Sequence, residues 1–210
     1  MSTGQPLSRM PKPSAEQYKN VRKLLLAPLF VFPISDSDEV EPLLEKYWSE
    51  IRDQVQNLER SLGSVTEVFH ENVFLTGDDG LNMVERINPK GHSFVQTLIR
   101  STANLVAFED QETIMELSDW QRCLSIGIMS EKVRKIVLDG YTQISSQRSE
   151  LLTKKINESI PEGGCAIIFT LEESKIQFPE DIQVFYISPP SLNEIKNWID
   201  EKVKSFPDLN

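Results

Sequence analysis

The fold is indicated most clearly by residues 165–199, whose sequence is CAIIFTLEESKIQFPEDIQVFYISPPSLNEIKNWI. The continuous apolar run 165–169 is typical of a strand that is buried on both faces, and residues 182–187 predict a second strand. The polar segment between them contains Pro179 and has no helical pattern long enough for a crossover helix. We therefore expect the two strands to be antiparallel, or separated within one sheet, rather than a βαβ pair.

A helix is predicted directly after the second strand. The corner Ser188-Pro189-Pro190 leads to Ser191, and Glu194 follows three residues later, which is the spacing of a capping box. The helix then shows apolar residues at a helical spacing: Leu192, Ile195, Ile199 and Val203. The proline pair is interpreted as a rigid turn.

Two long amphipathic helices are predicted upstream. The first carries an apolar stripe and ends at Gly63. Its stripe consists of Val40, Leu43, Leu44, Tyr47, Ile51, Val55, Leu58 and Leu62. The second begins at Ser130, ends before the Pro161-Glu162-Gly163-Gly164 turn, and has its own stripe. That stripe consists of Val133, Ile136, Val137, Tyr141, Ile144, Leu151, Leu152 and Ile156.

Shorter elements complete the expected fold. Strands are predicted at 29–34, 65–69 and 105–108, helices at 81–87, 93–103 and 110–126, and a loop at 77–80. The pattern predicts an α/β protein, with α+β as the alternative, in which long amphipathic helices cover a small mixed sheet. We expect one domain over residues 28–206 and a flexible basic tail over residues 1–27.

Charge and cysteine content limit the partners. The net charge is −10, whereas residues 1–27 hold five basic side chains and one acidic side chain, a net charge of +4. An acidic body disfavours nucleic acid and anionic membranes, so we expect a protein partner or self-association as a homodimer, and no membrane. Cys123 and Cys165 lie in apolar stretches and are interpreted as reduced, buried thiols of a cytoplasmic protein.

Two segments resemble a known group of proteins. Residues 178–195, FPEDIQVFYISPPSLNEI, with Trp198 and Ile199 after them, are similar to the end of an uncharacterised bacterial protein family. Residues 119–125, DWQRCLS, are similar to an internal piece of that family, and the likeness extends over residues 65–205. The resemblance implies a complete bacterial protein, and it implies no activity and no catalytic residue.

Familiar catalytic motifs are missing from the sequence. It contains no phosphate-binding loop, no dinucleotide fingerprint and no nucleophile elbow, and its two histidines, His70 and His92, stand in no metal-ligand spacing. We therefore favour a non-catalytic binding or regulatory protein without a cofactor, and whether the chain is an enzyme stays open. An RNA- or ribosome-associated accessory protein that uses the basic tail is one alternative.

A divalent-metal-dependent hydrolase is the other alternative. Asp36 and Asp38 follow the first predicted strand, and Glu172 and Glu173 follow the strand at 165–169. If these strands are parallel neighbours, the acids converge at one sheet edge and offer the oxygen ligands that Mg²⁺ prefers. The competing interpretation is that the first pair opens a helix and the second lies in a solvated loop.

The three tryptophans are candidates for a subunit interface. Trp48, Trp120 and Trp198 each lie on or beside an apolar helical stripe. Aromatic residues at the margin of a stripe are typical of an interface core, and most soluble oligomers are twofold. The competing interpretation is packing within a single subunit.

Overall fold

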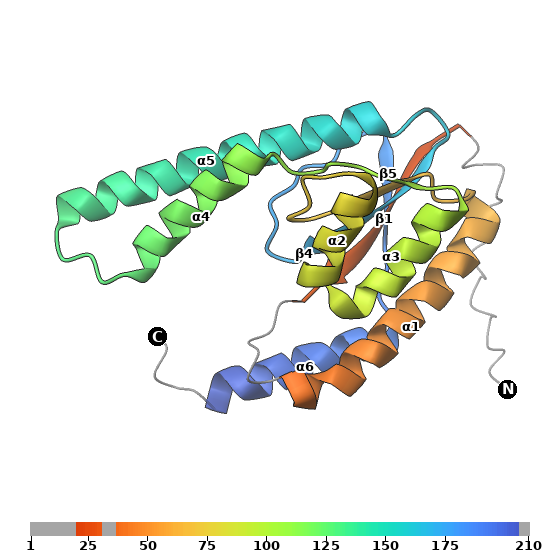
Figure 1. Cartoon of the computed structure of the whole chain (residues 1–210), viewed down its shortest axis with the longest axis horizontal. Helices are drawn as coiled ribbons and strands as arrows, with labels where there is room; N and C mark the ends of the chain where they lie inside the picture. Colours follow the sequence, from red (N-terminus) through yellow and green to blue (C-terminus); the bar gives the residue numbers. More distant parts are fainter. Residues whose placement is uncertain (1–19, 31–36, 206–210) are drawn as a thin grey trace, which may run out of the picture.

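The computed structural model describes residues 20–30 and 37–205 of the 210-residue chain. The elements within these ranges follow in the order β1 (Arg22–Leu29), α1 (Ser37–Leu62), β2 (Glu67–His70), α2 (Gly77–Ile87), α3 (Pro89–Ser101), β3 (Asn104–Leu105), α4 (Gln111–Ser125), α5 (Glu131–Ser159), β4 (Cys165–Leu171), β5 (Ile182–Tyr186) and α6 (Pro190–Ser205). Figure 1 shows their arrangement in space.

The strands form one five-stranded sheet in the order β3-β2-β4-β1-β5. The helix-rich α/β class is confirmed. Every described strand pair is parallel, so the strand directions differ from the mixed sheet that we expected. β4 and β5 are separated by β1, as one of our two alternatives held, and both run parallel to β1. The segment 172–181 crosses from the end of β4 back to the start of β5. It is irregular, so this parallel connection contains no helix.

The first strand begins earlier than predicted. β1 spans Arg22–Leu29 rather than 29–34, because it is hydrogen-bonded on both sides, to β4 and to β5, and Leu24 and Leu25 are fully buried. Residues 22–27 therefore do not belong to a flexible tail. Their two charges also serve the fold, since Arg22 Nε donates to Asp181 at 2.7 Å and Lys23 Nζ donates to the Gly163 carbonyl at 2.9 Å. The expectations for residues 1–19 and 31–36 lie outside the described residues.

The sheet carries a separate hydrophobic core on each face, because successive side chains of a strand point to opposite faces. Leu25 and Ala27 pack on one face under α1, α2, α3 and α6, whereas Leu24 packs on the other face against α5. Among the described residues, the two faces of the sheet are therefore covered differently. Four helices pack on one face, whereas the second half of α5 packs on the other, together with Ile176 and Phe178 from the β4–β5 connection.

Three helix starts differ from the predictions: α3 begins at Pro89 rather than at residue 93, and the other two are those of α2 and α6. α2 begins at Gly77, so the stretch predicted as a loop at 77–80 is helical. α6 begins at Pro190, and Ser191 does not form the expected capping box. Its backbone N–H and its hydroxyl both donate to Glu50 of α1, at 3.0 and 2.6 Å, while Glu194 pairs with Lys46. Side chains of α1 therefore bind the Ser191 and Glu194 groups that a local capping box would have paired with each other.

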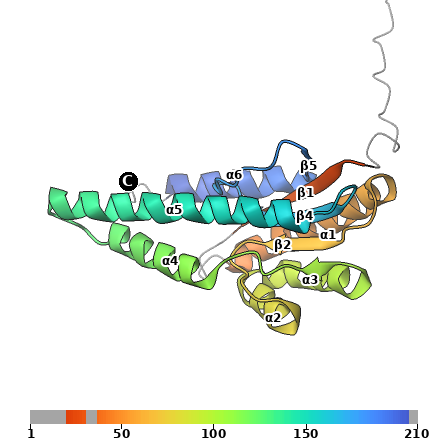
Figure 2. The same cartoon turned by 90° about the horizontal axis from the view of Figure 1, so that it is seen from above.

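Helices α4 and α5 form a two-helix arm that extends beyond the sheet (Figures 1 and 2). α4 packs along the first half of α5. The contact is close because Gly140 has no side chain: a Cβ there would lie 2.6 Å from the ring of Trp120. None of the described helices has both the length and the apolar character needed to cross a lipid bilayer.

Candidate functional site

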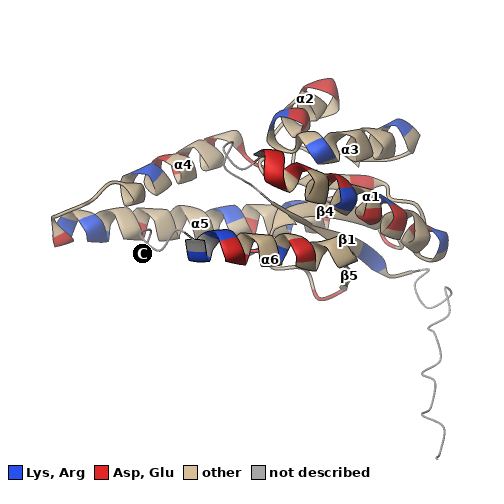
Figure 3. Cartoon of the chain, turned by 90° about the horizontal axis from the view of Figure 1, so that it is seen from below, with Lys and Arg blue, Asp and Glu red and all other residues tan. Residues whose placement is uncertain are grey.

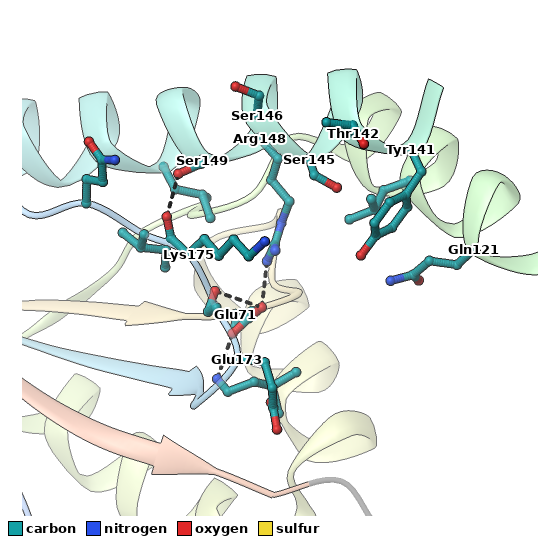
Figure 4. A pocket seen from close by; sticks show the side chains of 16 residues that line it. Glu71, Gln121, Tyr141, Thr142, Ser145, Ser146, Arg148, Ser149, Glu173 and Lys175 are labelled. Carbon is teal, nitrogen blue, oxygen red and sulfur yellow. Dashed lines mark hydrogen bonds and ion pairs between the residues drawn. The ribbon is translucent and has the colours of Figure 1, made fainter. Parts of the chain in front are cut away.

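A pocket lies where β2 and β4 end side by side. The chain leaves β2 towards β3 at one edge of the sheet, and it leaves β4 towards β5 on the opposite side. Such a reversal opens a crevice at the carboxyl ends of parallel strands, the usual place for a ligand in this fold class. A cavity of about 460 Å³ occupies this position beneath the base of the arm (Figure 4). Its walls come from Glu71, from Leu117 and Gln121 of α4, from residues of α5 between 141 and 152, and from the connection 171–177.

Arg148 of α5 is clamped by two buried carboxylates at the wall of this pocket. Its Nε donates to Glu109 at 3.0 Å, and its Nη2 donates to Glu71 at 2.8 Å and also to Glu109. Both glutamates are only 3% exposed. Burial lowers the pKa of Arg148, but the two carboxylates raise it by more, so the guanidinium stays charged. The clamp joins the arm to the ends of β2 and β3, and it leaves Nη1 of Arg148 for another acceptor.

Glu71 has no capacity left for a ligand or a proton-transfer role. One oxygen accepts from the Thr170 hydroxyl and from the Leu171 backbone N–H, both at 2.7 Å. The other accepts from Arg148 and from the Ser174 hydroxyl at 3.3 Å. This carboxylate therefore links the ends of β2 and β4 to α5, and it acts as the centre of the site's framework.

His70 is a buried structural residue at the end of β2. Its Nδ1 lies 2.8 Å from the Glu71 carbonyl oxygen, which can only accept, so Nδ1 carries the hydrogen. Its Nε2 then accepts from the Asn88 side-chain amide at 3.2 Å, and Asn88 accepts from the Gly91 N–H at the start of α3. Burial lowers the pKa of His70 to about 4, although hydrogen bonding to Glu71 opposes the shift. The imidazole is neutral and tied into the fold at both nitrogens.

We expect His70 to make the protein less stable as the pH falls from about 6.5 to about 4. The unfolded chain protonates this imidazole near pH 6.5, whereas the folded chain does so only near pH 4. Stability is therefore unaffected by this group above pH 6.5, and roughly 3 kcal/mol is lost by pH 4. The measurement is urea unfolding at a series of pH values for the native chain and for His70→Gln. The native chain should lose more stability across this range than the variant.

A matched control uses the other histidine. His92 is partly exposed on α3, so His92→Gln controls for the loss of a histidine that is not buried. If the native and His70→Gln profiles run parallel between pH 6.5 and 4, the buried neutral state of His70 is wrong.

Two side chains of the pocket, Arg148 and Lys175, can only donate hydrogen bonds, whereas its hydroxyl and amide groups can donate or accept. Lys175 extends from the β4–β5 connection towards Arg148, so two cationic side chains approach one part of the pocket (Figure 4). The Ser145 hydroxyl is shielded from solvent and has no hydrogen-bond partner among the described residues. Tyr141 and Gln121 line the same pocket, whereas Glu173 points away from Arg148 (Figure 4).

The predicted metal ligands do not come together among the described residues. β1 and β4 are indeed parallel neighbours, which is the condition that the prediction set. Asp36, however, lies outside the described residues, and Asp38 is exposed at the start of α1. Glu172 is held by Lys196 at 2.7 Å and by the Tyr186 hydroxyl at 2.6 Å. No three His, Cys, Asp or Glu side chains gather within ligand reach in the described part of the chain.

The three tryptophans have different environments. Trp48 is 5% exposed and packs on Phe169 of β4 with ring centroids 5.6 Å apart, because the apolar stripe of α1 faces the sheet. In the single chain it belongs to the core, which is the competing interpretation, and its interface role stays a prediction. Trp120 of α4 is partly buried, and its ring packs against Gly140 of α5. Trp198 is partly buried on α6, with the Lys202 ammonium 5.4 Å from its ring centroid. An interface role for Trp120 and Trp198 stays a prediction.

The two thiols also differ from each other. Cys165 is buried in β4, and burial raises the pKa of its thiol to about 11. Cys123 is only partly buried on α4, which corrects the expectation that both are buried, because α4 has one face free in the arm. Neither cysteine forms a disulfide.

Sequence reasoning missed the clamp of Arg148, Glu71 and Glu109. Glu71 did carry a usable signal, because it lies two residues after a predicted strand, where polar residues gather at the carboxyl edge of a parallel sheet. Glu109 stands beside the helix-capping Asp110, and Arg148 lies within an amphipathic helix. Nothing local marks either of these two as buried.

Together these features define an α/β protein with a parallel sheet and, at its carboxyl edge, a pocket that two cationic side chains approach. Comparisons of the chain with protein-family models, with curated proteins and with solved structures find no match. The resemblance to an uncharacterised bacterial family therefore stays a prediction.

Proposed function

We propose that this chain is a binding protein whose pocket takes a small organic anion, in keeping with a regulatory rather than a catalytic role. One observation carries the proposal: Arg148 and Lys175 approach the same part of the pocket beside the unpartnered hydroxyl of Ser145. Carboxylate and phosphate oxygens accept hydrogen bonds and carry negative charge, so they suit such a set of donors. Apolar walls from Leu117, Leu152 and Ile176 favour an organic body.

The geometry of the clamp supports recognition at this position. Arg148 is held in place by two carboxylates, so little of its side-chain freedom remains to be lost when a ligand binds. Its single positive charge is outweighed by the two carboxylates of Glu71 and Glu109, so the ammonium of Lys175 is the charge that attracts an anion. Lys175 is exposed and reaches the pocket from a connection without regular structure.

Binding is preferred over catalysis because the groups suited to proton transfer are occupied. His70 is buried, and both of its ring nitrogens are hydrogen-bonded. Both oxygens of Glu71 accept two hydrogen bonds each. A cytoplasmic location is part of the same proposal, and the two unpaired thiols support it.

Anion binding is expected to raise the melting temperature of the protein. A ligand present at 100 times its dissociation constant stabilises the native state by about 2.7 kcal/mol, which corresponds to roughly 5–10 °C for a chain of this size. The measurement is thermal unfolding with inorganic phosphate or succinate, at an ionic strength held constant with chloride. Neutral succinamide, which has the size of succinate without its charge, should give no shift.

Two variants on one connection provide the matched controls. Lys175→Gln should remove most of the shift, because it deletes the ammonium and leaves the pocket beside the net negative charge of the clamp. Glu173→Gln should keep the shift, since this side chain points away from Arg148 (Figure 4). The proposal is wrong if neither anion shifts the native melting temperature, or if Lys175→Gln responds as the native chain does.

A further inference from the structure

The tip of the α4–α5 arm exposes apolar side chains. The first six residues of α5, 131–136, are all exposed, although they include Val133 and Ile136. In the loop before them, Ile126 is 66% exposed and Met129 is 96% exposed. In a pair of helices, each helix buries only the face that contacts the other helix. The apolar side chains on the remaining faces are therefore exposed to water in the single chain. A patch of this kind marks an interaction surface.

Charges of opposite sign are separated along the arm (Figure 3). The tip, residues 122–136, contains one acidic residue, Glu131, and four basic residues: Arg122, Lys132, Arg134 and Lys135. The base segment, residues 110–121, contains no Lys or Arg. It contains four acidic residues, which are all exposed: Asp110, Glu112, Glu116 and Asp119. The arm therefore has a basic apolar tip and an acidic base.

We propose that the arm pairs with the arm of a second copy of this chain, side by side and in opposite directions. In that arrangement the basic tip of each arm lies against the acidic base of its partner. The base also offers an apolar contact, because Met115 is 60% exposed among its acidic neighbours. The contact occurs twice between the same two chains, so it closes as a twofold dimer.

A second copy fits this surface because the charge pattern is complementary to itself only when the arms are reversed. Two copies with parallel arms would bring tip to tip and base to base, with like charges facing each other. The chain as a whole carries a net charge of −10, so random encounters between copies are repulsive. The opposite charges on the arm select the one relative orientation that removes this repulsion locally.

Light scattering on the purified full chain tests the dimer. At high micromolar concentration in low salt, the expected mass is about twice the 24.0 kDa of one chain. Raised salt should weaken the dimer, since it screens exposed charges. A mass near that of one chain would assign the tip to a different partner and would overturn the proposal.

A charge-swap experiment tests the orientation. Variant one carries Lys132→Glu and Lys135→Glu, which makes its tip acidic. Variant two carries Glu112→Lys, Glu116→Lys and Asp119→Lys, which changes the charge of its base from −4 to +2. Each variant alone should be monomeric, because its tip and base now carry the same sign. An equal mixture of the two should form the dimer again, since both tip-to-base contacts are then complementary.

The mixture separates this arrangement from other interfaces. All five positions are exposed, so circular dichroism should show that both variants remain folded. If both variants stay dimeric, or if both are monomeric and their mixture stays monomeric too, the reversed pairing of arms is wrong. The test is independent of the anion pocket, because none of the five side chains lines it.

Discussion

Replacing Arg148 with methionine is expected to lower the free energy of unfolding by about 3–5 kcal/mol. The substitution leaves Glu71 and Glu109 buried with no cationic partner, and each of these glutamates is 3% exposed. Removing one side of a buried ion pair costs far more than removing an exposed charge, because the remaining charge has lost its compensation. Urea unfolding at neutral pH, followed by circular dichroism, measures the loss.

Two further variants identify the cause. The triple variant Arg148→Met, Glu71→Gln and Glu109→Gln should recover much of the lost stability, because it removes the unpaired charges together with the cation. Arg134→Met makes the same exchange at an exposed position of the same helix and should change stability by less than about 1 kcal/mol. If Arg148→Met is as stable as Arg134→Met, the three charges are not buried as described.

A chain that ends at Gly164 is expected to lose cooperative folding altogether. This truncation removes β4, which lies between β1 and β2 and pairs with both. It deletes Ile167 and Phe169 from one core and Ile168 from the other. Burial of one large apolar side chain contributes about 1.5–3 kcal/mol, whereas a whole domain is stable by only about 5–15 kcal/mol. Thermal unfolding followed by near-ultraviolet circular dichroism should show no transition.

A shorter truncation is the control for this result. A chain that ends at Ser205 keeps all the described elements and should unfold cooperatively, close to the native melting temperature. A soluble 1–164 fragment with a sharp transition would show that the first three strands and their helices form a core without β4.

Local patterns in the sequence were sufficient for most of the elements. The stripe from Val40 to Leu62 predicts α1 because a helix places residues three or four apart on one face. The run from Cys165 to Phe169 predicts β4 because a central parallel strand is buried on both faces. Gly63 marks the end of α1 and has a φ of +97°, which glycine adopts without strain. Each of these signals acts between residues that are close in the chain.

Strand order and direction required the tertiary structure. The sequence shows that β4 and β5 are strands, but both pair with β1, which lies more than a hundred residues earlier. β1 itself was placed too late, because Arg22 and Lys23 look like part of a basic tail until their partners Asp181 and Gly163 are known. Register and neighbours are set by contacts between distant segments, and no local pattern encodes them.

The candidate site depends even more on distant contacts. Glu71, Glu109 and Arg148 are ordinary charged residues in the sequence. The two glutamates are buried, and Arg148 is partly buried, only because the ends of β2 and β3 meet α5. Ser191 likewise has the spacing of a helix cap but donates to Glu50 instead. The sequence by itself determined which segments are helices and strands, because hydrophobic periodicity is a local property. Only the tertiary structure decided which charges are buried and which donors face the pocket, because burial and pairing depend on what other segments bring to the same place.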